Sequence, residues 1–175
     1  DGLDLAAVKQ GIEDAVLGND FAVSHEAIGE AFEEITAKLE AAERELSAAA
    51  RAEGEAYLAS NAARDNVTVT ESGLQFEVLT AGAGAKPAKS DKVRVHYHGT
   101  FPDGRVFDSS VTRGQPAEFP VTGVIAGWVE ALQLMTVGSK WKLTIPHHLA
   151  YGERGAGSIP PFSTLVFEVE LLDIV

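Results

Sequence analysis

Near its middle the chain reads Lys92-Val93-Arg94-Val95-His96-Tyr97-His98-Gly99, and this stretch alternates strictly between apolar and polar side chains. Val93, Val95 and Tyr97 fall on one face, and the basic and histidine side chains fall on the other. Successive side chains of a β-strand point to opposite faces, so the pattern predicts a half-buried strand. A strand with one face in the core and one in solvent is typical of an antiparallel sheet.

The sequence on both sides of this stretch continues the same pattern. Pro102-Asp103-Gly104 predicts a hairpin turn, with Val106 and Phe107 on the returning strand. Other stretches with strand-like alternation are Val67–Val69, Leu74–Val78, Trp141–Ile145 and Leu165–Leu171. Gly127–Gln133 is long enough for about two helical turns. We therefore expect an α+β domain in which a curved antiparallel sheet wraps round one short α-helix.

Residues 1–66 follow a helical pattern instead. They contain no proline and carry 15 acidic against 5 basic residues. A short helix is predicted from Leu5, Val8, Ile12 and Val16, with a stop at Gly18-Asn19-Asp20. A long helix is predicted over about residues 24–64, with Ser24 as its N-cap. This region is expected to be entirely helical and to precede the β-rich domain at 67–175.

Apolar residues recur along the long helix at alternating intervals of four and three residues. They are Ile28, Phe32, Ile35, Leu39, Ala42, Leu46 and Ala49. This spacing is typical of a coiled-coil seam. Two interpretations remain open: the stripe packs on the short helix or the next domain, or it contributes to self-association. We expect 1–66 to be a dimerisation and spacer region that makes the protein a homodimer.

Composition excludes several classes of function. The 175 residues include no cysteine, which excludes disulfides, thiolate nucleophiles and cysteine-ligated zinc. The formal net charge of −12 makes a nucleic-acid partner or an anionic membrane surface unsuitable. No stretch approaches the roughly 18 consecutive apolar residues that a membrane-spanning helix needs. The lack of a visible signal segment favours the cytoplasm, and a periplasmic form left by signal cleavage stays open.

Metal and nucleophile motifs are weak in this sequence. His96 and His98 share one strand face, but it is the charged face, so solvated side chains are the expected state. His147 and His148 are adjacent, which points their side chains in different directions on most backbones. No glycine-rich phosphate motif or Gly-x-Ser-x-Gly motif occurs. We expect neither a metal nor a cofactor.

The order of short motifs in the second part of the chain is more informative than its composition, which alone favours an ordinary core. In sequence order the motifs are Val95-His96-Tyr97-His98-Gly99, Phe107-Asp108-Ser109-Ser110, Val124-Ile125-Ala126-Gly127-Trp128, Ala150-Tyr151-Gly152, Ile159-Pro160-Pro161 and Leu165–Leu172. This series resembles the FKBP family of peptidyl-prolyl isomerases. With the helical region before it, the chain is similar to the Mip-like bacterial subgroup, in which a long helix precedes the FKBP domain.

The resemblance implies a sheet of five or six strands and a proline-binding pocket between sheet and helix. The catalytic residues that it implies are Tyr97, Asp108, Trp128, Tyr151 and Phe167. The substrate-binding residues that it implies are Phe107, Phe119, Val124, Ile125 and Ile159. Ala117 departs from the pattern, because many members have an aromatic residue just after the position of Pro116.

The resemblance also implies the activity. We expect an enzyme that accelerates X-Pro isomerisation in protein folding by desolvation and orientation in the aromatic pocket. The expected partners are unfolded or partly folded X-Pro polypeptides and macrolide inhibitors of the tacrolimus and rapamycin type. The alternative is a proline-directed chaperone, or holdase, with a minor catalytic role.

Overall fold

The structure, a computed structural model, describes residues 5–18 and 25–175. The chain divides into two compact units, Asp1–Arg44 and Glu45–Val175. The predicted N-cap Ser24 and the predicted stop residues Asn19 and Asp20 lie outside the described residues. No helix in the described ranges is long and apolar enough to cross a membrane.

The helices of the N-terminal region agree with the helical periodicity. Helix α1 spans Leu5–Leu17, and Gly18 follows it in the left-handed conformation at φ +69°. Helix α2 spans His25–Ala62, close to the predicted range of about 24–64. Its surface carries ion pairs between residues four apart, including Lys38–Glu34 and Arg44–Glu40. Such pairs between exposed side chains contribute only weakly to the stability of the helix, because water screens their charges.

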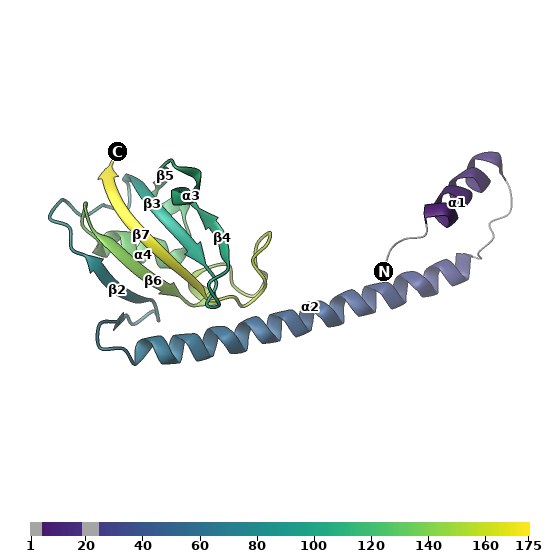
Figure 1. Ribbon diagram of the computed structural model, residues 1–175, viewed down its shortest axis with the longest axis horizontal. Helices are drawn as coiled ribbons and strands as arrows, with labels where there is room; N and C mark the ends of the chain where they lie inside the picture. The colour runs from purple at the N-terminus through teal and green to yellow at the C-terminus, as the bar shows by residue number, and fades with distance from the viewer. Residues whose placement is uncertain (1–4, 19–24) are drawn as a thin grey trace. The chain divides into compact units, whose positions relative to one another are not determined.

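The second unit is built on one antiparallel sheet. Its strands are β1 (Thr68–Val69), β2 (Gln75–Thr80), β3 (Lys92–Thr100), β4 (Val106–Ser109), β5 (Ala117–Pro120), β6 (Lys140–Ile145) and β7 (Leu165–Ile174). The helical segments between them are α3 (Ser110–Arg113), η1 (Val121–Gly123), α4 (Ala126–Leu134) and η2 (His147–Leu149). The strand order is β1-β2-β6-β7-β3-β4, and β5 also pairs with β3 (Figure 1). The predicted α+β fold, with a long helix before a sheet and a short helix, is confirmed.

Strand β3 has the alternation that its sequence predicts. Val93, Val95 and Tyr97 are buried, whereas Arg94 and His96 between them are only partly buried. It pairs with β7 on one side and with both β4 and β5 on the other, so it lies at the centre of the domain. Two different strands can share that side because β4 pairs with one end of β3 and β5 with the other.

Helix α4 packs on one face of the sheet and completes the core (Figure 1). Gly127, Trp128, Ala131 and Leu132 are its buried residues. Gly127 allows the helix to approach β6 closely, because a Cβ atom there would lie 2.6 Å from Ile145 Cγ2. This close approach places the next residue, Trp128, deep between helix and sheet.

The described residues contain seven strands, more than the five or six that the resemblance implies. The extra strands are short: β1 has two residues and β5 has four. Strand β5 and helix α3 were not predicted, because four residues are too few to establish a period of two or 3.6. Their positions depend on pairing with β3 and on capping, which are tertiary and local contacts rather than patterns.

The last turns of α2 belong to the same compact unit as the sheet. Asn61 Nδ2 donates to Gln75 Oε1 at 2.8 Å and to Thr144 Oγ1 at 3.3 Å, and all three residues are buried. Gln75 Nε2 donates in turn to the Leu58 carbonyl oxygen at 2.9 Å. Buried polar groups that satisfy one another in this way fix the relative position of helix and sheet. That residues 1–66 serve as a dimerisation and spacer region and residues 67–175 as the isomerase domain stays a prediction.

Candidate active site

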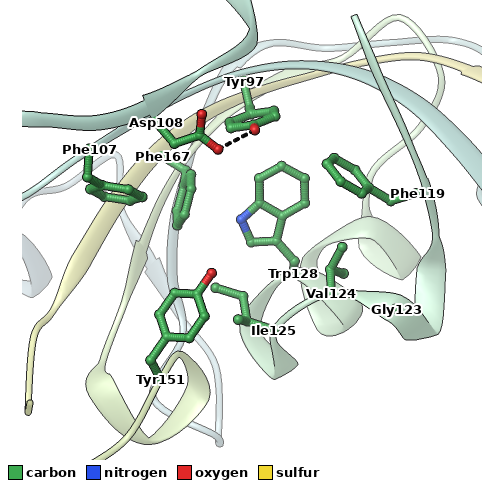
Figure 2. Close-up of a pocket in the computed structure, with 10 residues that line it drawn as sticks. All are labelled: Tyr97, Phe107, Asp108, Phe119, Gly123, Val124, Ile125, Trp128, Tyr151 and Phe167. Carbon is green, nitrogen blue, oxygen red and sulfur yellow. Dashed lines mark hydrogen bonds between the residues drawn. The ribbon is translucent and has the colours of Figure 1, made fainter. Parts of the chain in front are cut away.

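A cavity of about 390 Å³ opens between α4, the strands around β3 and the turn that follows η2. Ten residues line it, and Figure 2 shows them: Tyr97, Phe107, Asp108, Phe119, Gly123, Val124, Ile125, Trp128, Tyr151 and Phe167. They come from β3, β4, β5, β7, α4 and the segments that precede α4 and follow η2. The lining is largely aromatic, and its polar side-chain groups are few.

Trp128 lies at the base of this cavity and is only 4% exposed. Three rings meet it edge to face: Tyr97 at 5.5 Å, Phe119 at 6.0 Å and Phe167 at 5.3 Å between ring centroids, with interplanar angles of 83°, 87° and 84°. Such tilted contacts are favourable between aromatic quadrupoles and restrict each ring. The indole plane is therefore held in one orientation.

The indole Nε1 of Trp128 is buried and makes no hydrogen bond within the described residues. Figure 2 shows that the indole edge carrying this nitrogen faces Phe167. An N–H group directed at an aromatic face makes a weak favourable contact, which partly compensates for the missing acceptor. The base of the cavity thus has almost no polar character.

The polar part of the site is a cluster of three side chains. Tyr97 Oη donates to Asp108 Oδ2 at 2.5 Å (Figure 2). Arg113 Nη2 donates to Tyr97 Oη at 2.8 Å. Arg113 Nη1 also pairs with Asp108 Oδ1, and its guanidinium carbon lies 5.6 Å from the centre of the Tyr97 ring. The triangle joins a residue of the central strand to one of β4 and one of α3.

These contacts shift the acidities of the cluster. Burial raises the pKa of Tyr97, and its hydrogen bond to Asp108 raises it further. Burial opposes ionisation of Asp108, but the hydrogen bonds from Tyr97 and Arg113 outweigh burial and lower the pKa of this carboxyl. Asp108 is therefore a carboxylate and Tyr97 a neutral phenol over the neutral pH range.

Arg113 was not identified from the sequence. It lies in α3, where Ser109 Oγ accepts a hydrogen bond from Thr112 N at 3.2 Å as the N-cap, and Gly114 ends the helix at φ +71°. Ser110 Oγ, which is buried, accepts from Tyr97 N at 2.8 Å and attaches the helix to β3. The serine cap and the glycine after Arg113 are the only sequence signals that could have indicated this one-turn helix.

Nine of the ten residues implied by the resemblance line the cavity, and Ile159 does not. Ile159 is 8% exposed and belongs to the core, where it forms a β-bridge with Ala156. Tyr151 is 41% exposed, and Figure 2 shows its hydroxyl directed toward the cavity. Gly123, which the sequence did not suggest, completes the lining beside Val124. Ala117 is partly buried and packs against the core rather than the cavity.

Comparison with known proteins decides the family. A profile described as "FKBP-type peptidyl-prolyl cis-trans isomerase" matches residues 84–172, and one described as "Domain amino terminal to FKBP-type peptidyl-prolyl isomerase" matches residues 1–78. The chain is 59% identical to the FKBP-type 22 kDa peptidyl-prolyl cis-trans isomerase of Escherichia coli, over all of this chain and 85% of that protein. The chain belongs to the FKBP-type peptidyl-prolyl cis-trans isomerases.

Other members of the FKBP family match nearly the whole length of this chain. The chain is 49% identical to the FKBP-type isomerase FkpA of Aeromonas hydrophila, over 98% of this chain and 65% of that protein. The crystal structure of FkpA from Escherichia coli superposes with a TM-score of 0.79 at 39% identity, over 99% of this chain and 83% of the other. The predicted family and the predicted enzyme class, a peptidyl-prolyl cis-trans isomerase, are confirmed.

An FKBP-type isomerase has no bond to break, and a largely aromatic cavity with few polar side chains fits that requirement. Rotation about an X-Pro bond is opposed by amide resonance, with a barrier of about 18–20 kcal/mol. What such an enzyme needs is a dry, shaped surface for the prolyl ring and a few hydrogen-bonding groups for the flanking carbonyls.

Proposed function

We propose that the cavity above Trp128 is where this isomerase binds and rotates X-Pro bonds, by desolvation and orientation. The observation that carries the proposal is the edge-to-face enclosure of Trp128 by Tyr97, Phe119 and Phe167. It makes an apolar base of fixed shape at the bottom of an open cavity. The polar side chains Asp108 and Tyr151 also line that cavity.

Desolvation supplies the catalytic step. A planar X-Pro amide is more polar than the twisted amide, whose nitrogen has become pyramidal, and water therefore stabilises the planar form more. Removing water from the amide in an apolar cavity favours the twisted form and lowers the barrier. No co-reactant or covalent intermediate is needed.

Orientation is divided among the lining residues. Trp128, Val124 and Ile125 hold the prolyl ring, with Phe107 and Phe119 at its sides and Phe167 beside Trp128. The Tyr151 hydroxyl and the Ile125 backbone N–H hold the flanking carbonyls of the peptide. Asp108, as a carboxylate, fixes the Tyr97 hydroxyl and presents a negative charge toward the displaced carbonyl carbon.

An isomerisation assay on an X-Pro peptide series tests this assignment. Protease-coupled rates are measured with and without tacrolimus or rapamycin, which we expect to bind in the same cavity. Competitive loss of activity, together with perturbed resonances of Trp128 and Tyr151 on macrolide binding, is the expected result. Activity unaffected by a macrolide that perturbs these residues would overturn the location of the site.

The second candidate function is a proline-directed holdase, which the exposed apolar surface of α2 favours. Phe32 and Leu39 are 67% and 66% exposed, and exposed apolar side chains are what an unfolded chain contacts on a holdase. Refolding of a proline-limited protein distinguishes the two functions. A catalyst speeds the slow phase at a small fraction of the substrate concentration, whereas a holdase suppresses aggregation only near equal concentrations.

Self-association through the N-terminal helices is proposed on the same surface. The larger seam residues Ile28, Phe32, Ile35, Leu39 and Leu46 are between 39% and 67% exposed. An apolar heptad stripe in water is stabilised by pairing with a second copy. Region 1–66 then carries the dimer contacts, and region 67–175 carries the chemistry.

The proposed compartment is the cytoplasm, and the periplasm is the alternative. Fractionation of the source cells tests the compartment.

A further inference from the structure

The segment between β6 and β7 contains an unusual backbone conformation. Phe162 has φ +59°, and it is the one non-glycine residue with a positive φ among residues 5–18 and 25–175. Bulky side chains avoid this left-handed region, and they persist there only when surrounding contacts hold the backbone. Contacts on more than one side of Phe162 are therefore expected.

One set of contacts connects Phe162 to the turn that bears Tyr151. Phe162 N donates to the Gly152 carbonyl oxygen at 2.9 Å, and Gly152 N donates to the His147 carbonyl oxygen at 2.8 Å. The His147 ring meets the Phe162 ring at 5.2 Å and 68°. Because Gly152 is bonded directly to Tyr151, the position of Phe162 and the position of Tyr151 are linked by a short hydrogen-bonded path.

A second set of contacts comes from helix α2. The guanidinium carbon of Arg51 lies 5.5 Å from the centre of the Phe162 ring. One turn further along, buried Gly54 lies against Thr164: a Cβ atom at position 54 would be 2.9 Å from Thr164 Cβ and closer still to its Oγ1. Only a residue without a side chain allows α2 to lie this near the start of β7.

The helix is also anchored two turns beyond Gly54. The buried hydrogen bonds of Asn61 to Gln75 and Thr144 hold it against β2 and β6, and Thr144 is one residue before the end of β6. The segment that leaves β6 at Ile145 and returns to β7 at Leu165 therefore has α2 contacts near both of its ends. The contacts of Arg51 and Gly54 are continuous with this anchored interface.

We propose that the C-terminal part of α2 is a positioning element of the isomerase site, in which Arg51 and Gly54 hold Phe162 and Thr164 and so fix Tyr151 at the cavity. The inference rests on the proposed function, because it assigns Tyr151 a role in orienting the peptide. The helix that precedes the catalytic domain then contributes to catalysis without contacting substrate. Arg51 and Gly54 are positioning residues, and the reacting amide touches neither.

A pair of matched glycine substitutions in α2 tests the proposal in the full chain. Gly54→Ala forces α2 away from Thr164, whereas Gly29→Ala meets nothing within 4 Å. Both changes raise helix propensity equally. We expect Gly54→Ala to lower kcat/KM for an X-Pro peptide about 3- to 30-fold, since small displacements of orienting groups are costly. Gly29→Ala is expected to leave kcat/KM unchanged.

A second matched pair examines the contact of Arg51. Arg51 also pairs with Glu55, with 2.9 Å between Nε and Oε1, so both Arg51→Ala and Glu55→Ala remove this surface ion pair. Only Arg51→Ala removes the cation beside Phe162. Amide hydrogen exchange supplies a readout that activity does not: we expect faster exchange at Phe162 N and Gly152 N in Arg51→Ala and Gly54→Ala, and wild-type exchange in the controls.

A double-mutant cycle with Tyr151→Phe separates this inference from the proposed function. If α2 acts through Tyr151, the loss caused by Gly54→Ala is much smaller in the Tyr151→Phe background than alone. Tyr151→Phe with full activity would overturn the role of Tyr151 and this inference with it. Two outcomes, each with a slow Tyr151→Phe variant, would show that the positioning role is wrong while the proposed site stands. In the first, Gly54→Ala matches Gly29→Ala in activity and in hydrogen exchange. In the second, Gly54→Ala lowers activity by the same factor in the Tyr151→Phe background as in the wild-type protein.

Discussion

Tyr97 and Asp108 are joined by a hydrogen bond of 2.5 Å from the phenol hydroxyl to carboxylate Oδ2, and Arg113 binds both. The bond connects the centre of β3 to β4, so the tyrosine that forms one wall around Trp128 cannot rotate independently of the polar side of the cavity. Hydrogen bonds to a charged partner are among the stronger ones in proteins. This pair is therefore the link between the shape of the site and its electrostatics.

Replacement of Asp108 by asparagine removes the charge and keeps the size of the side chain. We expect kcat/KM for an X-Pro peptide to fall by about 10- to 100-fold, because a hydrogen bond to a charged group contributes roughly 1.5–3 kcal/mol. Asp103→Asn is the matched control, since Asp103 pairs with Arg105 on the hairpin outside the cavity. Equal activity of the two variants in the protease-coupled assay would contradict the role assigned to Asp108.

The acidities of the pair predict a flat pH profile in the neutral range. The pKa of Asp108 is lowered in the folded chain, so its stabilising contribution is complete above the unfolded value of about 3.9 and is lost as pH falls through the folded pKa. The pKa of Tyr97 is raised, so its contribution is complete below the unfolded value of about 10 and is lost as pH rises through the folded pKa. We therefore expect this pair to leave both kcat/KM and the free energy of unfolding unchanged between about pH 5 and 9. A change of kcat/KM with pH inside that window that is present in the wild-type protein and absent from Asp108→Asn would show that the pair has a different ionisation state.

Trp128→Leu tests the base of the cavity. The change removes three edge-to-face ring contacts and leaves space beneath the prolyl ring, so kcat/KM is expected to fall by at least about tenfold. Large-to-small changes at buried sites also cost stability, about 2–4 kcal/mol here. Activity is therefore measured at a temperature where circular dichroism shows the variant folded. Trp141→Leu is the matched control, because it removes the other tryptophan, whose ring stacks on Phe76. We expect this variant to be less stable than the wild-type protein and to keep its activity.

Gly127→Ala tests how α4 places Trp128. The added methyl would lie 2.6 Å from Ile145 Cγ2 in the core, so the helix has to shift. We expect a loss of about 1–3 kcal/mol in the free energy of unfolding, in spite of the better helix propensity of alanine. Gly123→Ala, whose methyl would meet Pro120 at an ordinary 3.4 Å, is expected to change stability by less than about 0.5 kcal/mol. Chemical denaturation of both proteins provides the comparison.

Charged substitutions in the seam of α2 test self-association. Phe32→Asp with Leu39→Asp places like charges on the exposed apolar stripe, so a dimer seen by sedimentation velocity is expected to become a monomer. Activity on a short X-Pro peptide is expected to stay within twofold, because neither Phe32 nor Leu39 is among the residues that line the cavity. Glu33→Ala, on another face of the same helix, serves as the control. A wild-type chain that sediments as a monomer at high concentration would refute the dimer.

Local sequence patterns account for most of the architecture. The period of two in Lys92–Gly99 and the uninterrupted helical stretch before residue 64 correspond to β3 and α2 within a few residues. Both patterns reflect the backbone geometry of a single element, so neighbours in sequence suffice to reveal them. The aromatic residues of the cavity were also found, but only because their order resembles a known family. Composition could not distinguish a pocket from a core, since both need buried rings.

By itself, then, the amino-acid sequence determined the fold class and the long helix, and its resemblance to a known family pointed to nine of the ten residues that line the cavity. Tertiary structure alone decided that Arg113 completes the Tyr97–Asp108 pair, that Ile159 turns into the core and that Gly54 lies against Thr164. The reason is physical. A periodic pattern is a property of one segment, whereas a hydrogen bond or a close approach depends on where two distant segments meet, as Gly54 and Thr164 do. Trp128 shows both levels, because its segment predicts a helix and only the packing of Gly127 on Ile145 carries its indole to the base of the cavity.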